Sequence, residues 1–169
     1  MNNRQRLIAG AGILLMLCVF SATMLFRSLQ PYPAPKVVFK TITGEKIALS
    51  ELRGQPVIIN FWASTCGYCL EEMPHLANLY RELSPKGFKL IGIAMPYDMP
   101  SQVVQISKQL DIPYAVAIDP DDTVARAFGN VRFTPTSFLI DANGMIIDKT
   151  TGRMDLDDLR NRLDQLLGD

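Results

Sequence analysis

The stretch PVIINFWASTCGYC, residues 56–69, places two cysteines three positions apart directly behind a run of apolar residues. The run from Pro56 to Trp62 is long and apolar enough for a central β-strand covered on both faces. A helix is expected immediately after the cysteines. Pro74 falls inside it and predicts a kink, and Pro85 and Gly87 are expected to end it. The apolar residues that set the helical spacing are Leu70, Met73, Leu76, Tyr80 and Leu83.

A CxxC pair between a strand and a helix has a physical reason to react with disulfides. Cys66 falls where the helix begins, so its sulfur lies over unpaired backbone N–H groups and the positive end of the helix dipole. That environment stabilises the thiolate, which is the form that attacks disulfides. Cys69 lies one turn inward and is the candidate resolving thiol. Three alternatives to a redox pair stay open: a structural zinc site with His75 as a third ligand, a fixed structural disulfide, and a chance spacing of reduced core cysteines.

Outside this stretch the sequence alternates between strand and helix patterns. Lys36–Thr41 and Lys46–Leu49 flank a Thr43-Gly44 turn and predict a hairpin. Asn143-Gly144 predicts a second hairpin near the end of the chain. The order, a hairpin and then β-α-β-α-β-α-β-β-α, predicts an α/β fold with a mixed sheet covered by helices. The other expected strands are Phe88–Ala94, Tyr114–Ile118, Thr136–Ile140 and Met145–Lys149, and the other helices are 101–110, 122–128 and 155–167, with Ser101 and Asp155 as caps.

Composition narrows the possible functions. The chain has 169 residues with 17 basic and 17 acidic side chains, one histidine and three cysteines. Three cysteines do not build a dense disulfide framework, and a balanced charge argues against a nucleic-acid binder. Apolar residues make up 48% of the chain, which excludes wholesale disorder. The first 30 residues, however, contain three arginines and no acidic residue.

The N-terminal segment predicts attachment to a membrane. Residues 7–26 carry no charge, and as a helix they would span about 30 Å, the thickness of a bilayer core. Arg4 and Arg6 precede the segment, so we expect residues 1–6 in the cytoplasm and the rest of the chain across the membrane. Residues 27–35 contain three prolines and predict an extended linker to a domain over residues 36–169.

Two alternatives to an uncleaved anchor remain open for this segment. A cleaved signal peptide would use Ser21-Ala22-Thr23 as a weak cleavage site. A lipoprotein would use Cys18, although Leu17 precedes it where a small residue is expected. The uncleaved anchor, with Cys18 as a small apolar residue in the membrane, fits the length of the segment best.

The cysteine stretch and a later tripeptide together resemble the active site of the thioredoxin superfamily. The matching residues are Asn60–Cys69, Glu72 and Pro74, and Thr134-Pro135-Thr136. More narrowly, the chain resembles the membrane-anchored TlpA/ResA-like thiol-disulfide oxidoreductases over roughly residues 36–169.

This resemblance implies a thioredoxin-like fold with an N-terminal hairpin extension, and a redox pair, Cys66 and Cys69, that reduces disulfides in exported proteins. It implies a single-pass protein of the bacterial inner membrane with its domain in the periplasm. Apocytochrome c is then a candidate client, and a membrane electron donor of the thiol-relay type re-reduces the pair. We expect neither a cofactor nor a metal.

The resemblance also assigns roles to single residues at the substrate side. Trp62 is expected to pack beside the disulfide where substrate binds. The backbone of Thr134 is expected to pair with a substrate chain, and Pro135 to form a cis peptide bond that faces the cysteines. Pro74 matches the proline that kinks the first helix of the family.

Glu72 is the expected proton acceptor for Cys69. The two residues are three apart and therefore share a helix face, and the family has a functional glutamate at this spacing. The alternative is a helix-start acid, as Glu71 would be. Thioredoxins proper carry a buried Asp where this chain has Asn60, and an amide cannot accept the proton. Gly67-Tyr68 places no cation between the thiols, which favours a mild reductant.

Two rival functions belong to related folds. A peroxiredoxin-like peroxidase would have Pro and Thr where this chain has Ile59 and Ala63. A copper(I)-handling module would use a wider cysteine spacing and a distal histidine, whereas His75 is the single histidine and is expected to be solvated. Met95 and Met99 are expected in a loop on the core, and the acids Asp119, Asp121 and Asp122 in a turn and helix cap.

Overall fold

The computed structural model describes residues 16–21 and 30–168. The chain divides into two compact units, Met1–Pro31 and Tyr32–Asp169, and the second contains the cysteine pair. Residues 16–21 are helical. Within the two described ranges, no helix is both long and apolar enough to cross a membrane. The other residues of the anchor expected over 7–26 lie outside the described part of the chain.

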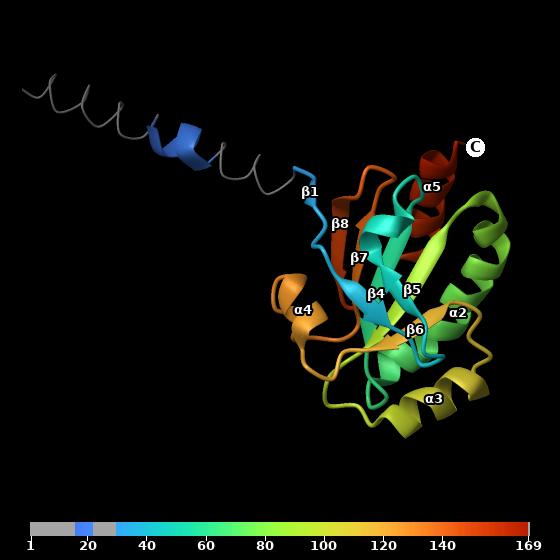
Figure 1. Cartoon of the computed structure of the whole chain (residues 1–169). Helices are drawn as coiled ribbons and strands as arrows, with labels where there is room; N and C mark the ends of the chain where they lie inside the picture. Colours follow the sequence, from blue (N-terminus) through green and yellow to red (C-terminus); the bar gives the residue numbers. More distant parts are fainter. Residues whose placement is uncertain (1–15, 22–29, 169) are drawn as a thin grey trace, which may run out of the picture. The chain divides into compact units, whose positions relative to one another are not determined.

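A six-stranded mixed sheet forms the centre of the second unit (Figure 1). Its strand order is β1-β8-β7-β4-β5-β6. The neighbours β4, β5 and β6 are parallel, whereas β7 runs antiparallel to β4 and β8 antiparallel to β7. The sheet is therefore mixed, as the sequence predicts. The strands are β1 (Tyr32–Pro33), β4 (Val57–Trp62), β5 (Lys89–Ala94), β6 (Ala115–Ile118), β7 (Thr136–Ile140) and β8 (Met145–Thr151).

The predicted N-terminal hairpin is a separate two-stranded sheet. Strands β2 (Val38–Lys40) and β3 (Lys46–Ala48) pair antiparallel, and Gly44 in their turn has a φ of 88°, a conformation that favours glycine. An isolated bridge between Thr41 and Ala117 attaches the hairpin to the edge strand β6. The 3₁₀-helix η1 (Leu49–Leu52) then leads toward β4.

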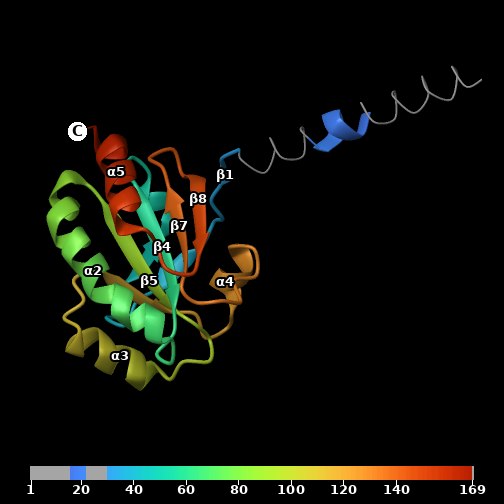
Figure 2. The same cartoon turned by 180° about the vertical axis from the view of Figure 1, so that it is seen from behind.

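Helices cover both faces of the central sheet (Figures 1 and 2). On one face pack α2 (Gly67–Leu83), α3 (Pro100–Gln109) and α5 (Leu156–Leu167), and on the other pack α4 (Thr123–Ala127) and the hairpin. Because successive strand residues point to opposite faces, β4 sends Ile58 and Trp62 toward α2 and sends Ile59 and Phe61 toward α4. A short 3₁₀-helix, η2 (Ser84–Lys86), ends α2 at the predicted position.

The linker expected over residues 27–35 contributes two residues to the domain. Tyr32 pairs with Ile146 and Pro33 with Met145, so β1 forms an edge of the central sheet. Proline is tolerated there because an edge strand does not need every N–H for its ladder. The hydrogen-bonded domain therefore starts at Tyr32, four residues before Lys36.

The start of α3 differs from the sequence-based expectation. Met99 is the N-cap and Pro100 is the first residue, so Ser101 lies inside the first turn and does not cap it. Proline suits the first position because the N–H that it lacks would have no partner inside the helix. The predicted cap of α5 is confirmed, since the Asp155 carboxylate accepts hydrogen bonds from two backbone N–H groups.

The first turn of α4 is capped by a side chain that lies before the N-cap position. Asp122 occupies the N-cap position but makes no side-chain cap bond. Instead the buried carboxylate of Asp119 accepts the N–H groups of Val124 at 3.1 Å and Ala125 at 2.8 Å. The acidic cluster is thus a turn and helix cap, as expected, and Asp119 is the residue that performs the capping.

Asp119→Ala should lower the free energy of unfolding by about 1–3 kcal/mol, because two buried N–H groups lose their acceptor. Asp121→Ala is the matched control: its side chain is exposed, and we expect a change below about 0.5 kcal/mol. Urea unfolding of the oxidised protein, followed by tryptophan fluorescence, measures both. An Asp119→Ala protein as stable as the wild type would contradict this capping role.

Candidate active site

The two cysteines form a disulfide at the N-terminus of α2. The Cα atoms of Cys66 and Cys69 are 5.3 Å apart, and Cys66 is the N-cap residue of the helix. The Cys69 N–H donates to Cys66 Sγ at 3.2 Å. The helix therefore directs a backbone N–H and its positive dipole end at the sulfur of Cys66, which stabilises a thiolate there.

The two sulfurs differ in their access to solvent. Cys66 is half-buried, whereas Cys69 is 1% exposed and faces the sheet with the other buried residues of α2. A disulfide partner approaching from outside reaches Cys66 first. This asymmetry gives the pair one sulfur for attack and one for resolution.

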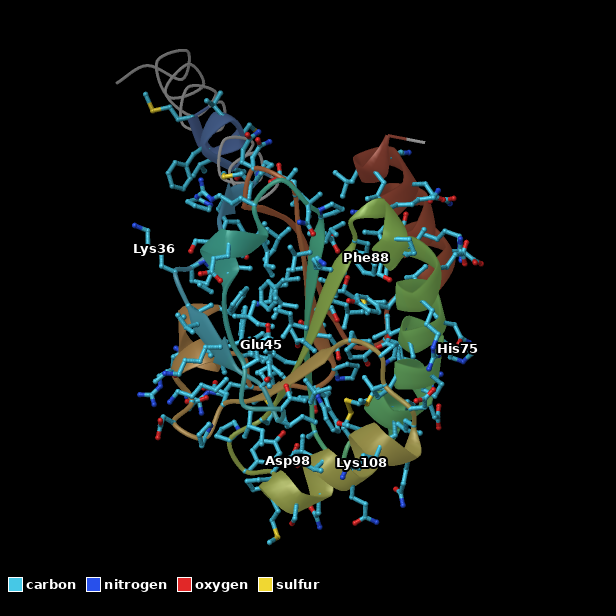
Figure 3. The ribbon with its side chains drawn as sticks, turned by 45° about the vertical axis from the view of Figure 1, so that its right-hand side comes forward. Lys36, Glu45, His75, Phe88, Asp98 and Lys108 are labelled. Atoms are coloured by element: carbon cyan, nitrogen blue, oxygen red, sulfur yellow. A yellow bond between two sulfur atoms is a disulfide. The ribbon has the colours of Figure 1, made fainter. Side chains whose placement is uncertain are left out.

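A buried carboxylate holds the loop that leads into the cysteines. Asp98, in the loop before α3, accepts the Ser64 N–H at 2.9 Å and the Ser64 hydroxyl at 2.6 Å (Figure 3). The two interactions tie the β4–α2 connection to the β5–α3 connection. Sequence reasoning missed Asp98, because a single acid in a loop carries no pattern and its partner lies 34 residues away.

The Thr134–Pro135 peptide bond is cis, as the resemblance implies. Pro135 is buried, and its carbonyl accepts the N–H of Gly152 at 2.8 Å. The backbone N–H and C=O of Thr134 have no hydrogen-bond partner within the described part of the chain. Phe133 before it is strongly exposed. This segment therefore offers free backbone groups and an exposed aromatic ring.

Glu72 lies one turn beyond Cys69 on the buried face of α2 and is only 5% exposed. Its Oε1 accepts the backbone N–H of Met154 at 2.7 Å. Burial raises the pKa of the Glu72 carboxyl, while the Met154 hydrogen bond and the nearby His75 lower it in part. A helix-start acid would be solvated; this carboxyl is instead a buried group with one anchoring donor.

Two buried polar groups behind the disulfide escaped the sequence analysis. Within the described residues, Tyr114 Oη and Trp62 Nε1 are buried and have no hydrogen-bond partner. Trp62 belongs to the same cluster of packed side chains as both cysteines, as expected, and its ring is fully buried. In the sequence, Tyr114 has the pattern of an ordinary core aromatic in a predicted strand. Its proximity to Glu72 follows only from the fold.

A salt-bridged arginine covers the outer side of the helix start. The Arg153 guanidinium lies over the Tyr68 ring at 4.7 Å and pairs with Glu71. Arg153, Gly152 and Met154 belong to one short connection between β8 and α5. That connection contacts the CxxC dipeptide through Tyr68 and the buried carboxyl through Met154.

Among the other residues singled out in the sequence, His75 lies near Glu72 but is exposed to solvent. His75 points away from the domain on the outer side of α2 (Figure 3). Asn60 is buried, and its amide donates to the Ser137 hydroxyl at 2.9 Å. Met95 is buried and Met99 exposed. Within the described residues there is no group of three His, Cys, Asp or Glu side chains arranged to hold a metal.

Comparison with known proteins agrees with this geometry. The model of the AhpC/TSA family matches residues 32–149. The thiol-disulfide oxidoreductase ResA of Bacillus cereus is 30% identical, over 96% of this chain and 98% of the relative. ResA of Bacillus subtilis is 28% identical, over 91% and 89% of the two chains.

Solved structures give the same result. A thiol:disulfide interchange protein of the thioredoxin family from Chlorobium tepidum superposes with a TM-score of 0.75 at 29% identity, over 82% of this chain and 98% of that one. The dsbF protein of MTB superposes with a TM-score of 0.71 at 25% identity, over 80% and 98%. The chain therefore belongs to the AhpC/TSA family and, within the thioredoxin superfamily, to the ResA-like thiol-disulfide oxidoreductases.

Proposed function

We propose that this thiol-disulfide oxidoreductase is a disulfide reductase of exported proteins, in which Cys66 attacks and Cys69 resolves. The observation that carries the proposal is the unequal exposure of two sulfurs at one helix start. The accessible sulfur of Cys66 also receives the helix N–H, and the buried sulfur of Cys69 is reached only from within the protein.

The reaction starts from the dithiol form. The Cys66 thiolate attacks one sulfur of a client disulfide, and the other client sulfur leaves as a thiolate that takes up a proton. Cys69 then loses its proton and attacks Cys66 Sγ. The second client thiolate leaves, and two electrons have passed from the pair to the client. The Cys66–Cys69 disulfide is the product of this half-reaction.

Glu72 accepts the proton of Cys69 in this proposal. A buried thiol has a raised pKa because its anion loses hydration, so an acceptor close by speeds resolution. Glu72 shares the buried helix face of Cys69, while the amide of Asn60 has no basic site for a proton. General-base assistance of this kind is worth about 10²–10⁴-fold.

Clients bind along the Thr134–Pro135 segment in this proposal. The free N–H and C=O of Thr134 provide one pair of backbone hydrogen bonds for an extended client strand. Trp62 is fully buried, so we assign it to the packing behind the disulfide and not to contact with the client. Apocytochrome c fits as a client because its haem-binding cysteines must be reduced.

We also propose that the protein is held at the bacterial inner membrane by residues 7–26, with its domain in the periplasm. The uncharged segment and the arginines before it support this location. A membrane electron donor of the thiol-relay type then returns the pair to the dithiol form. Neither a cofactor nor a metal takes part.

The order of attack predicts which variant traps clients. Cys69→Ser should accumulate mixed disulfides with client proteins in cells, because Cys66 still attacks and nothing resolves the product. Cys66→Ser should trap none. Non-reducing electrophoresis after acid quenching measures trapping by both variants. Equal trapping by the two would contradict the assignment of Cys66 as the attacking thiol and Cys69 as the resolving thiol.

If Glu72 accepts the proton of Cys69, replacing it should slow resolution and leave the attack by Cys66 unaffected. Glu72→Gln keeps an oxygen for the Met154 N–H, yet it should slow resolution by Cys69 about 10²-fold at neutral pH and leave attack by Cys66 unchanged. Burial raises the pKa of Glu72, so the carboxylate is protonated at a higher pH than an ordinary glutamate. As the pH decreases, the rate of resolution in the wild type should therefore begin to fall at a higher pH than an ordinary glutamate would predict. Glu71→Gln, on the exposed side, is the control. Stopped-flow kinetics from pH 5 to 9 separate attack from resolution. If Glu72→Gln resolves at the wild-type rate, Glu72 has only a structural role.

The anchor predicts the location of the intact protein. The full chain should fractionate with the inner membrane. A chain that starts at Tyr32, and so retains β1, should be soluble and should reduce a model disulfide at the wild-type rate. Recovery of a free periplasmic protein that begins after Phe26 would contradict an uncleaved anchor.

A further inference from the structure

The Trp62 indole and the Tyr114 ring pack over the same glycine, and each carries a buried hydrogen-bond donor without a partner in the described residues. A Cβ atom at Gly92 of β5 would lie 3.3 Å from Trp62 Nε1 and 3.3 Å from Tyr114 Cε2, so the indole and the phenol approach each other over this glycine. Tyr114 is only 5% exposed and Trp62 fully buried. Within the described residues neither Trp62 Nε1 nor Tyr114 Oη has a partner. Buried polar atoms of this kind are normally satisfied by protein or by an ordered water.

The Glu72 carboxyl is an acceptor in electrostatic range of the Tyr114 hydroxyl. Burial, together with the charge of Glu72, raises the pKa of the Tyr114 hydroxyl, which therefore stays protonated and able to donate. Within the described residues, the Met154 N–H is the single hydrogen-bond partner of the carboxyl. One carboxylate oxygen thus has acceptor capacity left for the unpaired donors.

The opposite side of Glu72 faces solvent. A hollow of about 480 Å³ opens there, and its lining carries a histidine from α2, a second acid and an arginine from the β8–α5 connection. Tyr114 approaches from the β6 side and Cys69 from the preceding turn of α2. These groups are the charged and titratable neighbours of the carboxyl. The hollow is lined by Glu71, Glu72, His75, Arg153, Met154 and Leu156.

We propose that Tyr114 is a positioning residue for Glu72, acting through one water that Tyr114 Oη, Trp62 Nε1 and the Glu72 carboxylate share. Three polar partners are what a buried water requires. Tyr114 and Trp62 donate to the water, and the water donates to the carboxylate, which stabilises the carboxylate against burial and orients it toward Cys69. During resolution the proton passes from Cys69 to Glu72, and the Cys69 thiolate attacks Cys66 Sγ. The bond from Cys66 to the client sulfur breaks, the client thiolate leaves, and the proton leaves through the solvent-facing hollow.

This inference rests on the proposed role of Glu72, and Tyr114→Phe tests it. The variant removes one hydroxyl and keeps the ring, so we expect the fold to be retained. Without that donor the pKa of Glu72 should rise by about one unit, since a hydrogen bond to the charged form favours it. The pH below which resolution becomes slow should rise by the same amount. At a pH below this midpoint, Tyr114→Phe should therefore resolve the mixed disulfide roughly ten-fold more slowly than the wild type.

The matched control is Tyr80→Phe. Tyr80 is half-buried, and its ring packs edge-on against Tyr114 at 5.9 Å, so this variant removes a hydroxyl from the same aromatic cluster. The titration of Glu72 in the reduced full-length protein is followed by the ¹³C shift of its carboxyl carbon, assigned by its loss in Glu72→Gln. Tyr80→Phe should leave this midpoint and the pH–rate profile unchanged.

The outcomes separate the two proposals. An unshifted Glu72 midpoint in Tyr114→Phe would overturn the positioning role, as would a further slowing when Tyr114→Phe is added to Glu72→Gln. If the midpoint shifts but Glu72→Gln resolves at the wild-type rate, the contact stands and the general-base role fails. A crystal structure of the protein should place a water between the three groups, and empty density there would overturn the bridge.

Discussion

The hydrogen bond from the Cys69 N–H to Cys66 Sγ depends on a helix that starts at one defined residue. That start lies at the end of β4, a strand of the central sheet with every residue buried. Because β4 pairs with β5 on one side and β7 on the other, its end cannot shift without breaking two ladders. The sheet therefore fixes where the positive end of α2 and the reactive sulfur lie.

The connection between β8 and α5 closes the site from the other direction. Gly152 donates to the carbonyl of the cis-proline Pro135, Arg153 covers Tyr68, and Met154 donates to Glu72. Three successive residues thus contact the cis-proline segment, the CxxC dipeptide and the buried carboxyl. A change in the position of this connection would therefore disturb all three contacts together.

Asn60 occupies the position where thioredoxins proper carry a buried Asp. Its amide donates to the Ser137 hydroxyl, and in the proposed mechanism proton transfer falls to Glu72, a carboxyl that enters from the helix instead of the strand. Glu72 lies between a buried layer with unpaired donors and a hollow open to solvent. Such a carboxyl can exchange a proton with water without exposing Cys69, which keeps the resolving thiol protected from outside disulfides.

The sequence by itself determined the order of strands and helices, the mixed sheet, the hairpin extension, and the place of Cys66 at a helix start. These follow from local rules: alternation of apolar residues, turn dipeptides, and the cysteine spacing. It did not determine that Asp119 caps α4, that Asp98 holds Ser64, or that Tyr114 and Met154 approach Glu72. The Asp119 cap is local, but the sequence offered three neighbouring acids for it. The other contacts join residues far apart in the chain, whose pairing depends on how strands and helices stack, and a lone polar residue has no period that reveals its partner. Only the tertiary structure decided them, because burial turns an ordinary tyrosine or aspartate into a group that must find a particular hydrogen bond.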